Sequence, residues 1–280
     1  MQTLLITGTS GFIGKHLLRN IKNFKVITDN NNFCTLNLPK IDFLIHQAAC
    51  TDTTNYDNDY MIDINCHKAI ELFKKAIENG CQKIVYASSA ACYGDNETIL
   101  SETTITKPIN PYACSKVMLD EKAEKLANDS KIPIIGLRYS NVYGPGEESK
   151  GTSASMVSRS LWQMVKGNPK LFKWGNQRRD WVFVKDVVDA NLNAILHGKS
   201  GIYNIGSGEN KSFNEIIANW NSLLKTNRKI EYIDNPYENK YQASTLLDIT
   251  KARKELKYNP QHDLLRGMKD YSPFSALNAL

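Results

Sequence analysis

Apolar and polar positions follow two periods along the first 140 residues, one typical of buried strands and one of amphipathic helices. Short apolar runs predict strands at 3–7, 24–28, 41–49, 83–89 and 132–139. Helical periodicity predicts helices at 11–22, 60–80 and 111–129. Because strands and helices take turns, we predict an α/β fold with a Rossmann-type, doubly wound parallel sheet.

The pattern becomes irregular after Tyr143, which predicts a smaller C-terminal α/β lobe that would bind a substrate. The apolar run VFVKDV (182–187) and the helix after it are expected to return to the large sheet. The expected division is a sheet domain of residues 1–142 and about 180–199, and a substrate lobe of about 143–179 and 200–280.

The turn after the first predicted strand, GTSGFIG, carries three evenly spaced glycines, Gly8, Gly11 and Gly14. Glycines let the backbone turn tightly and approach a pyrophosphate, which then faces the positive end of the following helix. A tight turn without a ligand is the alternative. At the N-terminus of an α/β chain the pattern favours a dinucleotide site that also includes Ser10, Phe12 and Ile13.

Asp29 ends the second predicted strand. A carboxylate there accepts hydrogen bonds from the adenosine ribose and disfavours a 2′-phosphate, so we predict NAD as the cofactor, with NADP as the alternative. The next connection is short, because only Pro39-Lys40 separates the apolar runs 34–38 and 41–46. A parallel crossover needs roughly a dozen residues or more. We therefore expect this crossover to be shortened or absent and the adenine side of the pocket to be thin.

Three residues suggest proton transfer at the edge of the sheet. PYACSK places Tyr112 and Lys116 four residues apart on one helix face, and Ser89 ends a predicted strand. A nearby ammonium and the positive charge of a nicotinamide can lower the pKa of a tyrosine. The phenol can then exchange a proton with a substrate hydroxyl that Ser89 would also hold. A surface pair and a strand-end cap are the alternative interpretations.

Composition limits the other function classes. The net charge of +6 is spread over 280 residues without a long basic run, so we expect no nucleic-acid partner. The six cysteines form no CxxC pair, which indicates reduced thiols and no metal site. Without a long apolar run or a signal-peptide pattern, we expect no membrane association and a cytoplasmic location.

Together these residues resemble the extended short-chain dehydrogenase/reductases, the NAD-dependent epimerase/dehydratase family of nucleotide-sugar enzymes, and within it the ADP-L-glycero-D-manno-heptose 6-epimerases. The glycine turn and YxxxK are shared across the whole superfamily, whereas a lysine-glycine pair followed by KYQA is found in a much narrower group. The resemblance covers residues 1 to about 260, and its strongest segments are 46–54, 86–94, 141–155, 168–187, 200–213 and 230–244.

The resemblance implies Tyr112 and Lys150 as the two acid/base residues of an epimerase that makes a lipopolysaccharide heptose precursor. For substrate binding it implies Asn141, Thr152, Arg159, Arg179 and Tyr241. For the cofactor it implies Gly11, Phe12, Asp29, Asn30, Gln47, Ala48, Ala49, Lys116 and Val142. Related enzymes often form homo-oligomers through the helices at 60–80 and 111–129, so we expect one here.

A second acid/base has a mechanistic reason. An epimerase removes a hydride, turns the ketone over and returns the hydride to the other face, so the carbonyl oxygen ends on the opposite side of the pocket. One tyrosine serves one side, and Lys150 would serve the other. A phosphate-binding lysine and a solvated lysine are the alternatives for this residue.

Other activities in the same family remain as alternatives. Arg159 stands where the heptose epimerases carry histidine, and KWG (173–175) replaces their EGS-like turn. The substrate pocket is therefore expected to differ from theirs, and another sugar is an alternative substrate. A UDP- or GDP-sugar 4-epimerase, or a nucleotide-heptose 4-dehydrogenase or ketoreductase, would need Ser89, Tyr112 and Lys116 but not Lys150. A non-catalytic NAD-binding subunit is disfavoured because YxxxK is intact. Ala90-Ala91 after Ser89 argue against a dehydratase.

Overall fold

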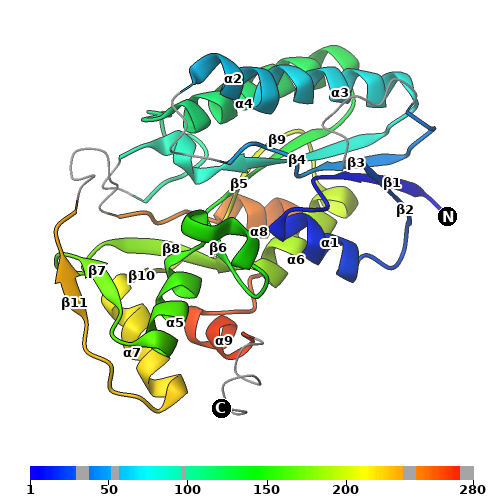
Figure 1. Ribbon diagram of the computed structural model, residues 1–280. Coiled ribbons are helices and arrows are strands. Elements are labelled where there is room, and N and C mark those ends of the chain that lie inside the picture. Colours follow the sequence, from blue (N-terminus) through cyan, green and yellow to red (C-terminus); the bar gives the residue numbers. More distant parts are fainter. Residues whose placement is uncertain (30–37, 52–56, 96–98, 236–243, 272–280) are drawn as a thin grey trace.

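Strands that are apolar on both faces form a sheet between two layers of helices, with a second group of elements beside it (Figure 1). The structure is a computed structural model that describes residues 1–29, 38–51, 57–95, 99–235 and 244–271. Within this part of the chain, no helix is long and apolar enough to span a bilayer.

The large sheet has six parallel strands in the order β2-β1-β3-β4-β5-β9. Their bounds are β1 Thr3–Thr7, β2 Lys25–Asp29, β3 Phe43–His46, β4 Lys83–Ser89, β5 Ile134–Tyr139 and β9 Gly201–Ile205. Thr7 is in register with both Asp29 and His46, so three strands end together. Strand order reverses beside β1, and ligands of open α/β sheets bind outside the carboxyl ends of the strands at such a point.

Helices cover both faces of this sheet (Figure 1). One face carries α1 Phe12–Asn20, α6 Val184–His197 and α8 Thr250–Leu256. The other carries α2 Asn58–Ile62, α3 Lys68–Glu78 and α4 Pro111–Ser130. A π-helical turn, Asp63–His67, joins α2 to α3. The long helix predicted at 60–80 is therefore present but is wound differently in its first half.

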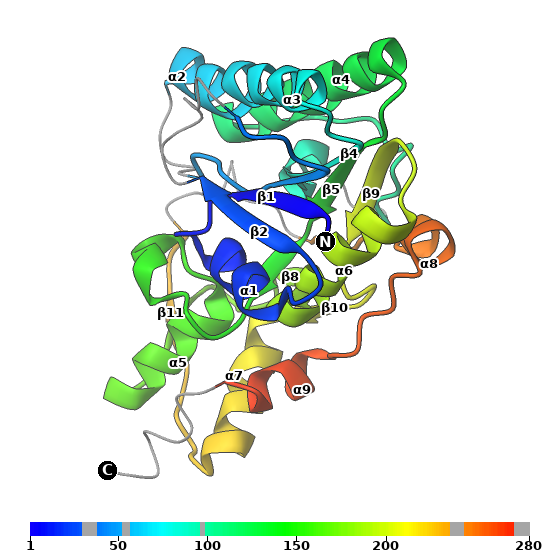
Figure 2. The same ribbon diagram turned by 90° about the vertical axis from the view of Figure 1, so that its right-hand side faces the viewer.

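The remaining elements form a second group with its own apolar core, below the large sheet in Figure 2. A three-stranded sheet contains β10 Asn210–Ser212, β8 Arg178–Phe183 and β6 Asn141–Tyr143, and a two-stranded sheet contains β7 Lys170–Phe172 and β11 Glu231–Ile233. The helices around them are α5 Met156–Lys166, α7 Phe213–Leu224 and α9 Leu264–Lys269. Two 3-10 turns, Ala90–Tyr93 and Glu148–Ser153, follow β4 and β6.

The predicted α/β fold with a parallel doubly wound sheet is confirmed, and two placements were wrong. The apolar run near 182 does not join the large sheet, because β8 pairs with β6 and β10, whereas the helix after it, α6, packs on that sheet as expected. Conversely, β9 lies in the large sheet, although the predicted lobe includes residues from 200 onward. The functional division of the chain into a cofactor part and a substrate part stays a prediction.

The short crossover after Asp29 is described only in part. Residues 38–42 contain no helix or strand, and β3 pairs with β1 on the side away from β2. The apolar run at 34–38 falls mostly on residues 30–37, which lie outside the described part of the chain.

A buried ion pair joins α4 to the sheet. Asp120 accepts hydrogen bonds from Arg138 Nε, Ser88 Oγ and Tyr86 Oη, each at 3.0 Å. Both charged side chains are almost fully buried, and the guanidinium lies 4.8 Å from the centre of the Tyr93 ring. Burial raises the pKa of Asp120 despite the arginine. The pair is therefore costly to bury, and removing one partner would leave a charge without compensation.

We expect Arg138→Met to lower the free energy of unfolding by about 3–5 kcal/mol, because it strands the Asp120 carboxylate in the core. The matched control is Lys75→Met, which breaks the exposed Lys75–Glu71 pair of 2.7 Å and should cost less than about 1 kcal/mol. Urea unfolding of the two variants measures the difference. Equal losses would contradict a structural role for the buried pair.

Candidate active site

A cavity of about 370 Å³ lies at the reversal point of the sheet, where the glycine turn meets the loop after β3. The predicted cofactor residues that line it are Gly8, Ser10, Gly11, Asp29, Gln47, Ala48 and Ala49. Thr7, Cys50, Tyr60 and Ile64 complete the wall. Sequence reasoning did not single out Tyr60 or Ile64, although their spacing of four on one helix face could have indicated a shared direction.

The backbone of the glycine turn fits a dinucleotide. Gly8 has φ of +70°, and a Cβ there would lie 2.5 Å from the Ala48 amide nitrogen. A Cβ on Gly14 would collide with the Gly8 carbonyl oxygen. The first turn of α1 follows Gly11, which supplies no side-chain cap, so its backbone N–H groups are available for an anion. These features suit the pyrophosphate of a nicotinamide cofactor.

Phe12, Ile13 and Val142, which are also predicted cofactor residues, are not among the residues that line this cavity. Phe12 is buried at the start of α1, and Ile13 and Val142 pack against the same apolar core. Gln47 is oriented by its amide, which donates to Tyr139 Oη at 2.9 Å and to Asn191 Oδ1 at 3.0 Å. The prediction for Asn30 lies outside the described residues.

Ser89, Tyr112 and Lys116 come together at the end of β4. Ser89 accepts the Ala91 amide at 3.1 Å, and its side chain also hydrogen-bonds Tyr112. Lys116 Nζ donates to the Ala87 carbonyl at 2.9 Å and lies 5.8 Å from the centre of the Tyr112 ring. Ser89 is thus a strand-end cap and a partner of Tyr112 at once, so the two interpretations of this residue do not exclude each other.

The pKa of Tyr112 differs from the expectation. Burial raises it to about 12, while the hydrogen bond with Ser89 acts in the opposite direction. The pKa of Lys116 is lowered to about 8 by burial, which outweighs the charge of Asp120. Lys116 alone therefore does not lower the pKa of Tyr112, because the phenol lies in a poorly solvated site and the ammonium points at a carbonyl. The effect of a nicotinamide charge on this pKa stays a prediction.

Asn65, which the sequence did not suggest, connects the loop after β3 to α4. Its side chain accepts the Cys50 amide at 2.8 Å and donates to the Cys50 carbonyl at 2.9 Å and to Ser115 Oγ at 3.1 Å. Asn65 is fully buried within the π-helical turn. The π-helical turn points the Asn65 side chain at both the loop after β3 and α4. The apolar periodicity of an ordinary α-helix does not predict this orientation.

Lys150 lies beside the start of α1. It belongs to the 3-10 turn after β6, and its Nζ is 5.2 Å from the centre of the Phe12 ring. The ammonium also contacts the Glu147 carboxylate at 3.1 Å, and the side chain is 29% exposed. Lys150 is therefore neither a free surface lysine nor a buried one, and it is placed next to the glycine turn.

The predicted substrate residues are spread over the second group of elements. Asn141 begins β6, Thr152 is exposed in the 3-10 turn, and Arg159 is half-buried on α5. Arg179 is buried on β8, where Nη1 donates to the Arg178 carbonyl at 2.8 Å. Whether these side chains meet one substrate stays a prediction, and Tyr241 lies outside the described residues.

The lowered pKa of Lys116 predicts a pH-dependent stability. Below pH 8 the folded protein buries a charged lysine, whereas the unfolded chain keeps this proton up to about pH 10.5. The penalty therefore fades as pH rises, and wild type should gain about 2 kcal/mol relative to Lys116→Met between pH 7 and pH 9.5. Urea unfolding of nucleotide-free protein tests this, and parallel pH curves for the two proteins would contradict it.

Comparisons with known proteins agree with this geometry. Residues 4–206 match the NAD dependent epimerase/dehydratase family. ADP-L-glycero-D-manno-heptose-6-epimerase from Helicobacter pylori is 32% identical, with a TM-score of 0.88 over 100% of this chain and 97% of that one. UDP-glucose 4-epimerase from Thermotoga maritima is 25% identical, with a TM-score of 0.89 over 99% and 100%. This chain therefore belongs to the NAD dependent epimerase/dehydratase family of nucleotide-sugar enzymes.

Proposed function

We propose that this protein is a nucleotide-sugar 6-epimerase that acts on ADP-glycero-manno-heptose and so supplies a heptose precursor of lipopolysaccharide. The proposal rests mainly on the position of Lys150, whose Nζ lies 5.2 Å from the centre of the Phe12 ring. Phe12 directly follows Gly11 of the glycine turn. The Helicobacter pylori heptose epimerase, 32% identical over the whole chain, supports the same substrate class. A 4-epimerase needs no lysine at this position.

Tyr112 and Lys150 would divide the proton transfers between them. Tyr112, hydrogen-bonded to Ser89, would exchange a proton with the sugar oxygen on one side of the pocket. A bound nicotinamide would supply the hydride acceptor and donor. After rotation about C5–C6 the oxygen would face Lys150, which would take the second acid/base role. Asn141, Thr152, Arg159 and Arg179 would hold the nucleotide-sugar, with Arg179 suited to a phosphate.

We expect conversion of ADP-D-glycero-D-manno-heptose to its L-glycero epimer without net cofactor consumption. In deuterated water, proton NMR should show hydrogen retained at C6, because the hydride returns from the cofactor. Tyr112→Phe and Lys150→Ala should each lower kcat by about 10²- to 10⁴-fold, as expected for loss of a general acid/base. Lys166→Ala, which removes an exposed lysine on α5, should leave kcat unchanged.

A 4-epimerase acting on a UDP-sugar is the second candidate, favoured by the Thermotoga maritima UDP-glucose 4-epimerase at 25% identity and full coverage. This activity would use Ser89, Tyr112 and Lys116. Interconversion of UDP-glucose and UDP-galactose by wild type and by Lys150→Ala alike, with no turnover of the heptose, would replace the first proposal by this one.

NAD is the cofactor we propose, because Asp29 ends β2 and lines the cavity. Its carboxylate would accept ribose hydroxyls and repel a 2′-phosphate. Asp29→Asn should weaken NAD binding about tenfold and reduce the preference over NADP, since a hydrogen bond to a charged group is replaced by a neutral one. Calorimetric titration with both nucleotides measures this, and a wild type that prefers NADP would refute the choice.

A further inference from the structure

Glu147 is a completely buried carboxylate in the loop that carries Lys150, with 0% of its surface exposed. Its Oε1 accepts hydrogen bonds from Gly144 N, Ser155 Oγ, Ser158 Oγ and Tyr271 Oη at 3.2, 2.8, 2.6 and 3.2 Å. Its Oε2 accepts Ser155 N at 2.7 Å and Lys150 Nζ at 3.1 Å. A buried carboxylate is tolerated only when such donors compensate it.

The donors divide into a neutral set and one cation. Amide and hydroxyl groups hold Oε1 and one side of Oε2, and they fix where the carboxylate lies. Among the ion pairs of the described residues, Lys150 is the cation that faces Glu147. Several groups hold the Glu147 carboxylate, whereas few hold the Lys150 ammonium. The carboxylate therefore determines where the ammonium lies, and not the reverse.

The loop itself is folded around this carboxylate. The Lys150 amide donates to the Glu147 carbonyl at 2.9 Å, and Gly151 turns the chain with φ of +52°. Ser155 then caps α5 by accepting the Ser158 amide at 3.2 Å. The backbone that carries Lys150 is therefore tied to Glu147 at both ends.

The C-terminal part of the chain supplies Tyr271 to this cluster. Its hydroxyl contacts both Glu147 and Ser158, and its ring packs edge-on against Trp220. Burial and then the charge of Glu147 raise the pKa of Tyr271 well above its usual range, so the phenol stays a donor.

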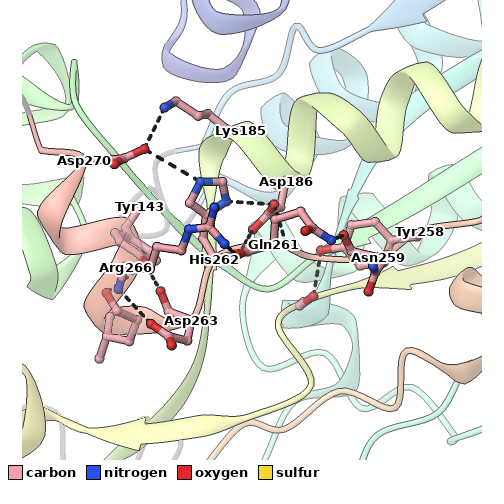
Figure 3. Close-up of polar contacts among 12 residues, drawn as sticks. Tyr143, Lys185, Asp186, Tyr258, Asn259, Gln261, His262, Asp263, Arg266 and Asp270 are labelled. Atoms are coloured by element: carbon pink, nitrogen blue, oxygen red, sulfur yellow. Dashed lines mark hydrogen bonds and ion pairs between the residues drawn. The ribbon is translucent and has the colours of Figure 1, made fainter.

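Tyr271 is itself held through the residue before it. Asp270 pairs with Lys185 of α6 at 2.7 Å, and His262 lies between Asp270 and Asp186 (Figure 3). Asp186 also accepts the backbone amide of Gln261 at 2.9 Å. This network anchors the segment that carries Tyr271 on the helix layer of the large sheet.

We propose that Glu147 is a positioning residue that holds the Lys150 ammonium beside Phe12, and that Tyr271 fixes Glu147 from the C-terminal segment. The catalytic meaning of this arrangement rests on the proposed role of Lys150. The buried carboxylate would hold the ammonium of the second acid/base in one position, although the lysine side chain is flexible. Less side-chain freedom is then lost when the reaction takes place.

Glu147→Gln tests the proposal. Its amide oxygen can replace Oε1. Its NH₂ group would take the place of Oε2 and face the Ser155 amide and the Lys150 ammonium, which are also donors, so both hydrogen bonds to Oε2 would be lost. We expect kcat to fall about a hundredfold with little change in KM, because Lys150 is displaced while the substrate site is intact. Glu148→Gln, an exposed neighbour, is the control and should retain full activity.

A double-mutant cycle separates positioning from general stability. Glu147→Gln should add no further loss of kcat when Lys150 is already alanine, because it acts only through that lysine. Losses that multiply would overturn the proposal. If Glu147→Gln fails to fold, Tyr271→Phe takes its place in the cycle. We expect Tyr271→Phe to lower kcat by a smaller factor, and to cause no further loss of kcat when Lys150 is already alanine.

A measurement that does not depend on catalytic turnover tests this proposal separately from the proposed function. Acetylation of Lys150 by a soluble acylating reagent, followed by mass spectrometry, should speed up about threefold in Glu147→Gln, because the amine no longer leaves an ion pair to react. Lys166 should react equally in both proteins. If Lys150 is acetylated faster in Glu147→Gln but the wild type does not convert the ADP-heptose, the proposed 6-epimerase activity is refuted and the positioning role of Glu147 is supported. Unchanged labelling would refute the positioning whatever the substrate.

Discussion

The site depends on how α4 is fastened to β4 and β5 by two buried charges one helical turn apart. Lys116 donates to the Ala87 carbonyl, and Asp120 binds Ser88, Tyr86 and Arg138. Both charges are desolvated, so each must keep its partner or be neutralised. Sliding or rotating the helix would break both sets of contacts together. This fixes Tyr112, one turn before Lys116, against the end of the strand that carries Ser89.

A second constraint places the cavity at the end of β1 next to this helix. The glycine turn touches the loop at Ala48 closely enough to exclude any side chain at Gly8. Asn65 binds the same loop at Cys50 and reaches Ser115, the residue before Lys116. Movement of the loop is thus coupled to α4 through one buried amide. The cavity and the tyrosine therefore share a common support on the carboxyl edge of the sheet.

Local patterns predicted most of this, and the errors have physical reasons. Apolar runs and glycine spacing indicate strands and a turn, because burial and backbone conformation act locally. They could not assign β8 to its sheet, since an apolar run such as WVFV suits either one. Nor could spacing predict that Glu147 is buried or that the pKa of Tyr112 rises, because both depend on surroundings contributed by distant segments.

The two proposed acid/base groups stand on different supports. Tyr112 is carried by a helix that packs on the large sheet, whereas Lys150 follows β6, which pairs with β8 in the smaller sheet. β8 leads directly into α6, which packs on the large sheet, and α6 also holds the segment that carries Tyr271. The loop that carries Lys150 is therefore connected to the large sheet both through β8 and through Tyr271. The proposed mechanism requires these two groups on opposite sides of one substrate, and these supports would hold both in place although they are not neighbours in the chain.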